Sequence, residues 1–364
     1  MRLFHHLTLF LLLVSCAPRG ELTLFAGAGQ TGDLQRIYVG TTREIDEMGF
    51  PSGNRSRNLI FGRFDVSVPP EREPGSINWP YSAKPDPAQH FLLDNFSPIA
   101  TSEAFNSALR QELRSRRSES RTAIVFVHGF NNNFSEGLYR FAQLTEDLGL
   151  PFLPVHYSWP SAGHPLGYGY DRDSMLIARD GLETTLRSVS EAGVDEILLV
   201  GHSMGALLAM ETMRQMAIAD GQKGLRKIGG VVLISPDIDI DVFRQQANRI
   251  GKLPEPFYIF SSTRDIALRL SAGLTGQTAR LGNTTDVEQL AELNVTMVDI
   301  SAFSDGKIDH ATALASPSFL RLLRKVPDLG AAYGADPSAR IGLIPGTVLV
   351  VQNATRLIVP NLAQ

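Results

Sequence analysis

The sequence contains a single cysteine, Cys16, among its 364 residues, so it has no internal disulfide. It also lacks long runs of charge of one sign: beyond the short segment RSRRSESR at residues 114–121 no such run occurs, and the formal net charge is −4. Basic surfaces of the kind that bind nucleic acid are therefore not indicated. With 43% hydrophobic residues, the chain is long enough to bury a substantial core.

The first sixteen residues, MRLFHHLTLFLLLVSC, combine a weakly basic start with an apolar stretch from Leu7 to Val14. This stretch is shorter than the roughly 20 residues of a membrane-spanning helix, and residues 1–15 are predicted to be a signal peptide. Residues 13–16 (LVSC) resemble the bacterial lipobox. The resemblance implies cleavage before Cys16, lipidation of Cys16, and a protein anchored to a membrane of the bacterial cell envelope, facing the periplasm or the exterior. The alternative is an ordinary cleaved signal with an incidental cysteine.

Residues 27–32 (GAGQTG) fit the dinucleotide-binding pattern G-x-G-x-x-G, but they precede a strand-like segment instead of following one. We interpret residues 16–33 as the lipidated cysteine and a flexible tether, and we expect no cofactor.

From Leu34 onward, short apolar strands alternate with helical stretches, which indicates one α/β domain over residues 34–325. The pattern predicts a mostly parallel, eight-stranded sheet with helices on both faces. A C-terminal extension, 326–364, contains the alternating apolar stretch 341–360, which is interpreted as a hairpin against the domain or as a contact with a partner or membrane. The predicted strands cover residues 36–42, 60–68, 122–130, 152–160, 196–203, 229–237, 256–263 and 294–301.

The segment EILLVGHSMGALLAM, residues 196–210, places Ser203 in a G-x-S-x-G pattern between a strand-like and a helix-like run. A sharp strand-to-helix turn needs small residues two positions on either side of the serine, and it lifts the hydroxyl clear of the sheet. In this context the sequence resembles the α/β-hydrolase fold from about Leu34 to Leu323. The resemblance implies that Ser203 is a catalytic nucleophile.

In this fold, the acid and then the histidine follow the serine along the chain. His310 is the one histidine after Ser203, and it lies in a polar loop after the last predicted strand. The resemblance implies that it is the catalytic base. Asp265, after the seventh predicted strand, is the favoured acid, and Asp237, after the sixth, is the alternative.

Aspartates elsewhere near these segments are weaker candidates for chemistry. Asp299 and Asp305 are too near His310 in sequence to reach its far side. Asp237, Asp239 and Asp241 do not continue as a calcium loop, because its sixth and twelfth positions are not glycine and glutamate. No metal site is predicted.

The second part of an oxyanion hole is expected after the third predicted strand, where residues 128–132 (HGFNN) resemble the H-G-x segment of lipases and esterases. This resemblance implies that the amides of Phe130 and Met204 are the oxyanion donors and that His128 is structural. HGFNN, GHSMG, SPDID and RDIAL together resemble a bacterial α/β-hydrolase subfamily of uncharacterised function. Trp159, Tyr168 and Tyr170 are candidates for lining a substrate pocket or for packing.

These residues favour a serine hydrolase that acts on a small-molecule carboxylic ester through an acyl-enzyme on Ser203. The same residues would also suit an acyltransferase or a peptidase. A third alternative is a non-catalytic envelope protein that uses the fold for binding.

Overall fold

The computed structural model describes the greater part of the chain between residues 18 and 360. Cys16 and His310, two residues on which the sequence predictions depend, lie outside the described residues. The described residues are 18–81, 84–116, 121–149, 151–276, 279–284, 286, 288–290, 292–301, 313–324, 347–352 and 355–360.

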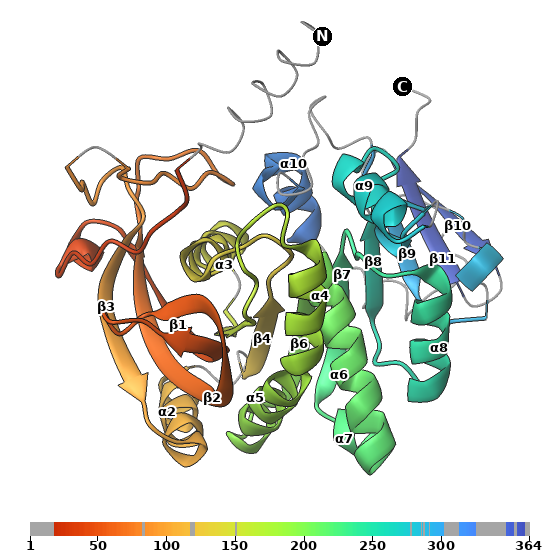
Figure 1. Cartoon of the computed structure of the whole chain (residues 1–364), viewed down its shortest axis with the longest axis horizontal. Helices are drawn as coiled ribbons and strands as arrows, with labels where there is room; N and C mark the ends of the chain where they lie inside the picture. Colours follow the sequence, from red (N-terminus) through yellow and green to blue (C-terminus); the bar gives the residue numbers. More distant parts are fainter. Residues whose placement is uncertain are drawn as a thin grey trace, which may run out of the picture.

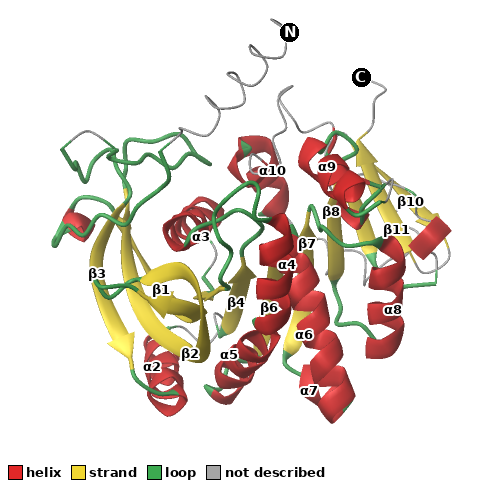
Figure 2. Ribbon diagram, viewed as in Figure 1, coloured by secondary structure: helices red, strands yellow, loops and turns green. Residues whose placement is uncertain are grey.

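A mostly parallel sheet of eleven strands forms the centre of the described structure (Figures 1 and 2). Its strand order is β10-β11-β9-β8-β7-β6-β4-β5-β1-β2-β3. The eight strands from β11 to β1 in this order run parallel, whereas β2, β3 and β10 pair antiparallel with their neighbours. The bounds are β1 Asp33–Ile45, β2 Pro51–Val68, β3 Leu92–Ile99, β4 Thr122–Val127, β5 Leu153–Ser158, β6 Glu196–His202, β7 Ile228–Ile234, β8 Phe257–Ser261, β9 Thr296–Asp299, β10 Thr347–Gln352 and β11 Thr355–Pro360.

The predicted mostly parallel α/β sheet is confirmed, and all eight predicted strands occur as β1, β2 and β4–β9. The count of eight was too low, because β3 and the hairpin β10–β11 belong to the same sheet. β3 was missed because it lies at the edge of the sheet and contains Asp94, Asn95 and Pro98, residue types that are depleted in strands.

Helices cover both faces of the sheet, which explains why its central strands are continuous apolar runs. Five of the six residues of β4, for example, are buried. One face packs against α2, α4, α5, α6 and α8, and the other packs against α3 and α10. The helices are α2 Ser102–Ser115, α3 Phe134–Leu148, α4 Tyr168–Ile177, α5 Arg179–Glu191, α6 Met204–Asp220, α7 Gln222–Leu225, α8 Ile240–Ile250, α9 Ile266–Leu274 and α10 Pro317–Leu323.

The segment of residues 18–33, predicted to be part of a flexible tether, packs against the domain instead. Its short 3-10 helix Ala28–Gln30 buries Ala28, and the Gly29 amide donates a hydrogen bond to Asp94 at 2.9 Å. The glycines of GAGQTG therefore form a turn that leads into β1. The prediction was wrong because glycine content shows freedom of the backbone and not the partners available to it.

The C-terminal hairpin predicted within residues 341–360 is confirmed. β10 and β11 pair antiparallel, and β11 pairs parallel with β9, where Leu357 lies opposite Met297. The described part of the C-terminal extension thus continues the domain's own sheet. No helix within the described ranges is long and apolar enough to cross a membrane.

Candidate active site

The turn between β6 and α6 holds Ser203 in an unusual backbone conformation, with φ 54° and ψ −122°. A Cβ on Gly201 would lie 2.7 Å from Cα of Ala206, and one on Gly205 would lie 2.5 Å from the carbonyl oxygen of Val127. Both distances are shorter than real Cβ contacts allow, so both positions require glycine. This is the strand-turn-helix geometry in which a G-x-S-x-G serine is presented at the edge of the sheet.

The loop after β4 lies directly against this serine. A Cβ on Gly129 would be 2.8 Å from Cβ of Ser203 and 2.7 Å from Nδ1 of His202. Phe130 follows Gly129, and Met204 is the first residue of α6, where the amides of a helix N-terminus carry partial positive charge. The structure therefore brings the segments of both predicted oxyanion donors to one place.

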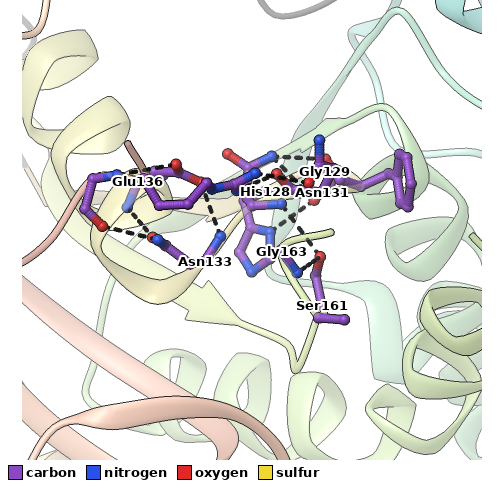
Figure 3. Close-up of polar contacts among 12 residues, drawn as sticks. His128, Gly129, Asn131, Asn133, Glu136, Ser161 and Gly163 are labelled. Carbon is purple, nitrogen blue, oxygen red and sulfur yellow. Dashed lines mark hydrogen bonds and ion pairs between the residues drawn. The ribbon is translucent and has the colours of Figure 1, made fainter. Parts of the chain in front are cut away.

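Hydrogen bonds of asparagine side chains within this loop stabilise the turn of the chain between β4 and α3. Asn131 adopts φ 56°, in the left-handed region. The side-chain Nδ2 of Asn132 donates to the carbonyls of Gly129 and Phe130 at 3.3 and 2.9 Å. Asn133 caps α3 in a reciprocal arrangement with Glu136, so the loop ends at a fixed helix start (Figure 3). We call residues 128–133 the oxyanion loop.

Arg43, on β1, lies fully buried beneath the oxyanion loop. Its five N–H groups all have acceptors, and two of these belong to the loop: Nη2 contacts the carbonyl of Asn132 at 3.0 Å and Nε2 of His128 at 3.4 Å. The other acceptors are the Ser158 hydroxyl and the carbonyls of Ser52 and Ser161.

Among the described residues, no carboxylate is within ion-pair distance of Arg43. Burial lowers the pKa of its guanidinium to about 10, so the group stays charged at neutral pH. Burying a cation that has only neutral partners costs desolvation free energy. The contacts of Arg43 fix the position of the Asn132 carbonyl in the loop.

Asp171, on α4, holds the same loop from another side. Its carboxylate accepts hydrogen bonds from the Ser161 hydroxyl at 2.5 Å, the Ala162 amide at 2.7 Å and the Asn131 amide at 3.4 Å. Burial raises the pKa of Asp171, and these hydrogen bonds oppose the rise. The loop 159–163 and the oxyanion loop are thereby joined through one carboxylate.

The first described residues hold the outer side of the oxyanion loop. Arg19 donates to the side chain and the carbonyl of Asn131 at 2.9 and 2.8 Å and forms an ion pair with Glu136. The Asn133 side chain donates to the carbonyl of Gly20 at 2.8 Å. Residues 19–20 therefore act as a strap between the N-terminal segment and the loop beside Ser203.

His128 packs as a structural residue, as the resemblance implied. Its ring stacks on Trp159 with centroids 5.1 Å apart, Nδ1 faces the carbonyl of Gly129 at 2.9 Å, and burial holds its pKa well below the ordinary value. The neighbouring His156 is also buried, with its pKa lowered to about 3 by burial. Both imidazoles are neutral at pH 7. Trp159, a candidate for lining the pocket, is fully buried in this packing.

Asp265, the favoured acid, is buried where β8 gives way to α9, and its side chain caps α9 by accepting from the Leu268 amide at 3.0 Å. The cap fixes the orientation of this carboxylate at the edge of the sheet. Its predicted partner His310 lies outside the described residues.

Asp237, the alternative acid, lies near the serine but has other partners. Its amide donates to the carbonyl of Ser203 at 3.2 Å, so the two main chains touch. Its carboxylate accepts from the Ser271 hydroxyl at 2.5 Å and the Tyr168 hydroxyl at 2.9 Å, and it pairs with the buried Arg280 at 3.2 Å. Tyr168 thus has a polar role between α4 and α9.

We call the glycine-flanked turn of residues 201–205, which holds Ser203, the elbow. A pocket of about 440 Å³ opens beside it. Gly129, Phe130 and His202 form its inner wall, and Trp79 and Leu314 give it apolar surface. Arg140 also lines it, with one guanidinium nitrogen bonded to the carbonyl of Gly75 at 3.0 Å and to Gln143 at 2.7 Å.

Tyr170, the remaining candidate pocket aromatic, is exposed at the surface instead. Its ring lies beneath Arg55, with the ring centroid 3.9 Å from the guanidinium carbon. Within the described ranges, no group of three His, Cys, Asp or Glu side chains could hold a metal ion.

Sequence reasoning missed the supports of the oxyanion loop. Arg43 carries one weak signal, a charge in the strand IYVGTTREI, and the N-x-x-E spacing of Asn133 and Glu136 is a readable capping pattern. For Arg19 and Asp171 we find no signal in the sequence, because their contacts with Asn131 span 112 and 40 residues.

Comparison of the structure with solved structures finds esterases at low identity. An esterase from Pyrococcus furiosus is 11% identical, with 87% of this chain and 97% of that chain covered and a TM-score of 0.36. Esterase B from Lactobacillus rhamnosis is 14% identical, with 60% and 78% covered and a TM-score of 0.40. An esterase from Rhizomucor miehei is 13% identical, with 83% and 87% covered and a TM-score of 0.36.

No curated protein matches the chain. The model of one family matches residues 101–326, which is well over half of the chain and includes the oxyanion loop, the elbow and both candidate acids. The chain belongs to this family, which is described as alpha/beta hydrolase of unknown function (DUF900).

Proposed function

We propose that this protein is a serine hydrolase that cleaves carboxylic esters through an acyl-enzyme on Ser203. The observation that carries the proposal is the contact between two segments distant in sequence: the strained Ser203 turn and Gly129, whose hypothetical Cβ would lie 2.8 Å from Cβ of the serine. A binding protein would have no need for a costly serine conformation packed against a loop of potential oxyanion donors.

In the proposed reaction, the Ser203 hydroxyl attacks the ester carbonyl while His310 accepts its proton. Negative charge develops on the carbonyl oxygen, which the amides of Phe130 and Met204 stabilise. His310 then protonates the departing alcohol, and water releases the acyl group by the same steps. Asp265 orients His310 and stabilises its imidazolium form.

The contacts of the two aspartates support this assignment of the acid. Both oxygens of Asp237 accept from hydroxyl groups, and one also pairs with the Arg280 guanidinium. An acid with these partners contributes to packing between α4 and α9. Asp265 caps α9 and lies at the strand end that commonly bears the acid in this fold.

We also propose that Cys16 is lipidated and anchors the protein in the bacterial cell envelope, on the periplasmic or exterior side. The support is the placement of the sole cysteine directly after a short apolar segment. Metabolic labelling with a palmitate analogue should mark the protein, and Cys16→Ser should abolish the label. Equal labelling of the variant would contradict the anchor.

The hydrolase proposal is tested with a fluorophosphonate probe and a panel of p-nitrophenyl esters of different acyl length, run beside amide and thioester substrates. The wild-type chain should react with the probe and hydrolyse esters. Ser203→Ala should lose the labelling and lower turnover by about 10⁴-fold or more. A folded wild-type chain that never reacts would favour a binding protein, and faster amide or thioester turnover would favour the peptidase or acyltransferase alternative.

A further inference from the structure

Helix α9 carries apolar side chains on two opposite faces. Its inner face buries Leu268 and Ala272 against the domain. Its outer face bears Ile266, Leu270 and Leu274, which are 57, 66 and 72% exposed. The spacing i, i+4, i+8 aligns these three along one side of the helix. A surface helix of a soluble domain normally has polar residues there.

This outer face borders the candidate active site. α9 begins directly after Asp265, Ala267 lines the pocket beside the elbow, and Ser271 bonds to the Tyr168 hydroxyl at 2.9 Å. Figure 1 shows α9 at the edge of the molecule where β8 ends, away from α7. We call Ile266, Leu270 and Leu274 the α9 surface.

Exposed apolar residues are common when scattered, but a grouped set beside a pocket indicates a contact with another apolar body. Two observations favour a lipid bilayer as that body. Exposed Arg264 and Arg269 flank the apolar residues, and cations at the border of an apolar helical face complement anionic lipid headgroups.

The second observation is where the N-terminal segment reaches the domain. Arg19 lines the same pocket as Ala267 and is bonded to the oxyanion loop. Cys16 is three residues earlier, so it can lie no more than about 10 Å from Arg19 along an extended chain. The apolar run from Leu7 to Val14 precedes it. A lipid on Cys16 would therefore hold the side of the pocket lined by Arg19 and Ala267, together with the α9 surface, at the bilayer.

We propose that the α9 surface docks on anionic phospholipid bilayers, so that the pocket beside Ser203 receives its ester from the membrane. The choice of a bilayer rests partly on the proposed lipid anchor at Cys16. The docking itself needs no covalent lipid, because it arises from burial of the apolar side chains among acyl chains. It implies that the natural substrate is an amphiphilic ester with one end in the membrane.

Because Cys16 is the single cysteine of the chain, replacing it allows one introduced cysteine to be labelled selectively. In a Cys16→Ser background, Leu274→Cys is labelled with a polarity-sensitive fluorophore and mixed with vesicles of phosphatidylcholine and phosphatidylglycerol. Ile218→Cys, labelled identically, is the matched control. Ile218 is 48% exposed near the end of α6, and α6 runs away from the edge that carries Ser203. We expect a blue shift and quenching by brominated lipid chains at position 274 and neither at position 218.

A second variant measures the strength of docking. Adding Leu270→Ser to the labelled Leu274→Cys chain should raise the lipid concentration needed for half of the response by about tenfold. Arg269→Glu should weaken the response to anionic vesicles more than to pure phosphatidylcholine vesicles. Hydrolysis of a soluble p-nitrophenyl ester should stay the same in both variants.

Three results would overturn the inference. These are equal responses at positions 218 and 274, no response at 274, and a shift at 274 that depends on protein concentration without vesicles, which would indicate a second copy as the occupant. Docking and hydrolysis fail separately: Ser203→Ala should dock like the wild type, and a wild type that docks without hydrolysing esters would contradict only the proposed reaction.

Discussion

The oxyanion loop after β4 and the segment from β8 into α9 lie at the same edge of the sheet, yet they are held in different ways. Buried Arg43 and Asp171 hold the first from inside, and Arg19 holds it from outside. In the second, Asp265 is buried and its side chain caps α9. The outer face of that helix is apolar and exposed.

In the proposed reaction, the two regions would supply different groups. Amide donors stabilise charge only when they are aimed before the reaction, so the backbone that carries them needs support from several directions. An acid needs one fixed carboxylate, which a helix cap provides. The rest of α9 is then available to form a surface.

The largest expected effect separates the two aspartates. Asp265→Asn should lower kcat on an activated ester by about 10³–10⁴-fold with little change in KM, because the imidazolium loses its charged partner. Asp237→Asn should cost far less in kcat but should lower the free energy of unfolding by about 3 kcal/mol, because it leaves the Arg280 cation buried and unpaired.

Steady-state kinetics and urea unfolding of both variants measure the two effects. The reverse ranking of kcat in two well-folded variants would identify Asp237 as the acid.

Gly129→Ala tests whether the oxyanion loop must touch the serine. The added Cβ would press on Ser203 and His202, so the loop should retreat and its amide donor should lose its aim. We expect kcat to fall by about 10²–10³-fold, the usual cost of losing one oxyanion donor. Pre-steady-state acylation rates measure this directly. The matched control is Gly169→Ala, where a Cβ meets no atom within 4 Å. Equal activity in the two variants would contradict the proposed loop role.

Arg43→Met tests the buried support beneath the loop. The change removes contacts to Asn132 and His128 while keeping much of the volume, and we expect kcat to fall by about 10–10²-fold with KM nearly unchanged. Arg280→Met, at an equally buried arginine paired with Asp237, is the control for stability alone. If both variants lost the same activity at equal fractions folded, Arg43 would have no specific role in positioning the loop.

The smallest effect concerns pH and the buried histidines behind the loop. His156 has a native pKa of about 3, while an unfolded histidine has a pKa of about 6.5. Between these values the unfolded chain binds a proton that the native state does not, so stability falls as pH falls from about 6.5 toward 3. The slope from one such histidine is at most about 1.4 kcal/mol per pH unit.

Urea unfolding from pH 7.5 to 5 measures that slope. His156→Phe should make it shallower, whereas His164→Phe, at an exposed site, should leave it unchanged. A slope that stays the same in His156→Phe would show that other groups carry the acid sensitivity.

The sequence predicted much of the fold because its signals are local. Apolar runs separated by helical periodicity identified eight strands, and GHSMG with its flanks identified the elbow at Ser203. Edge strand β3 was missed, because an edge strand lacks the apolar continuity that burial on both faces imposes. The tether at residues 18–33 was predicted wrongly, because its partners, Asp94 and the oxyanion loop, lie more than 60 residues away.

The sequence by itself determined that Ser203 sits at a glycine-flanked turn after a buried strand, because that conformation depends on residues within a few positions of the serine. It also determined where the eight apolar strands lie along the chain. Only the tertiary structure decided that Gly129 meets Ser203, that Arg43 and Asp171 support the loop between them, and that Asp237 pairs with Arg280. These contacts join residues dozens of positions apart, and their free energies depend on burial and charge pairing that exist only once the sheet has brought the strand ends together.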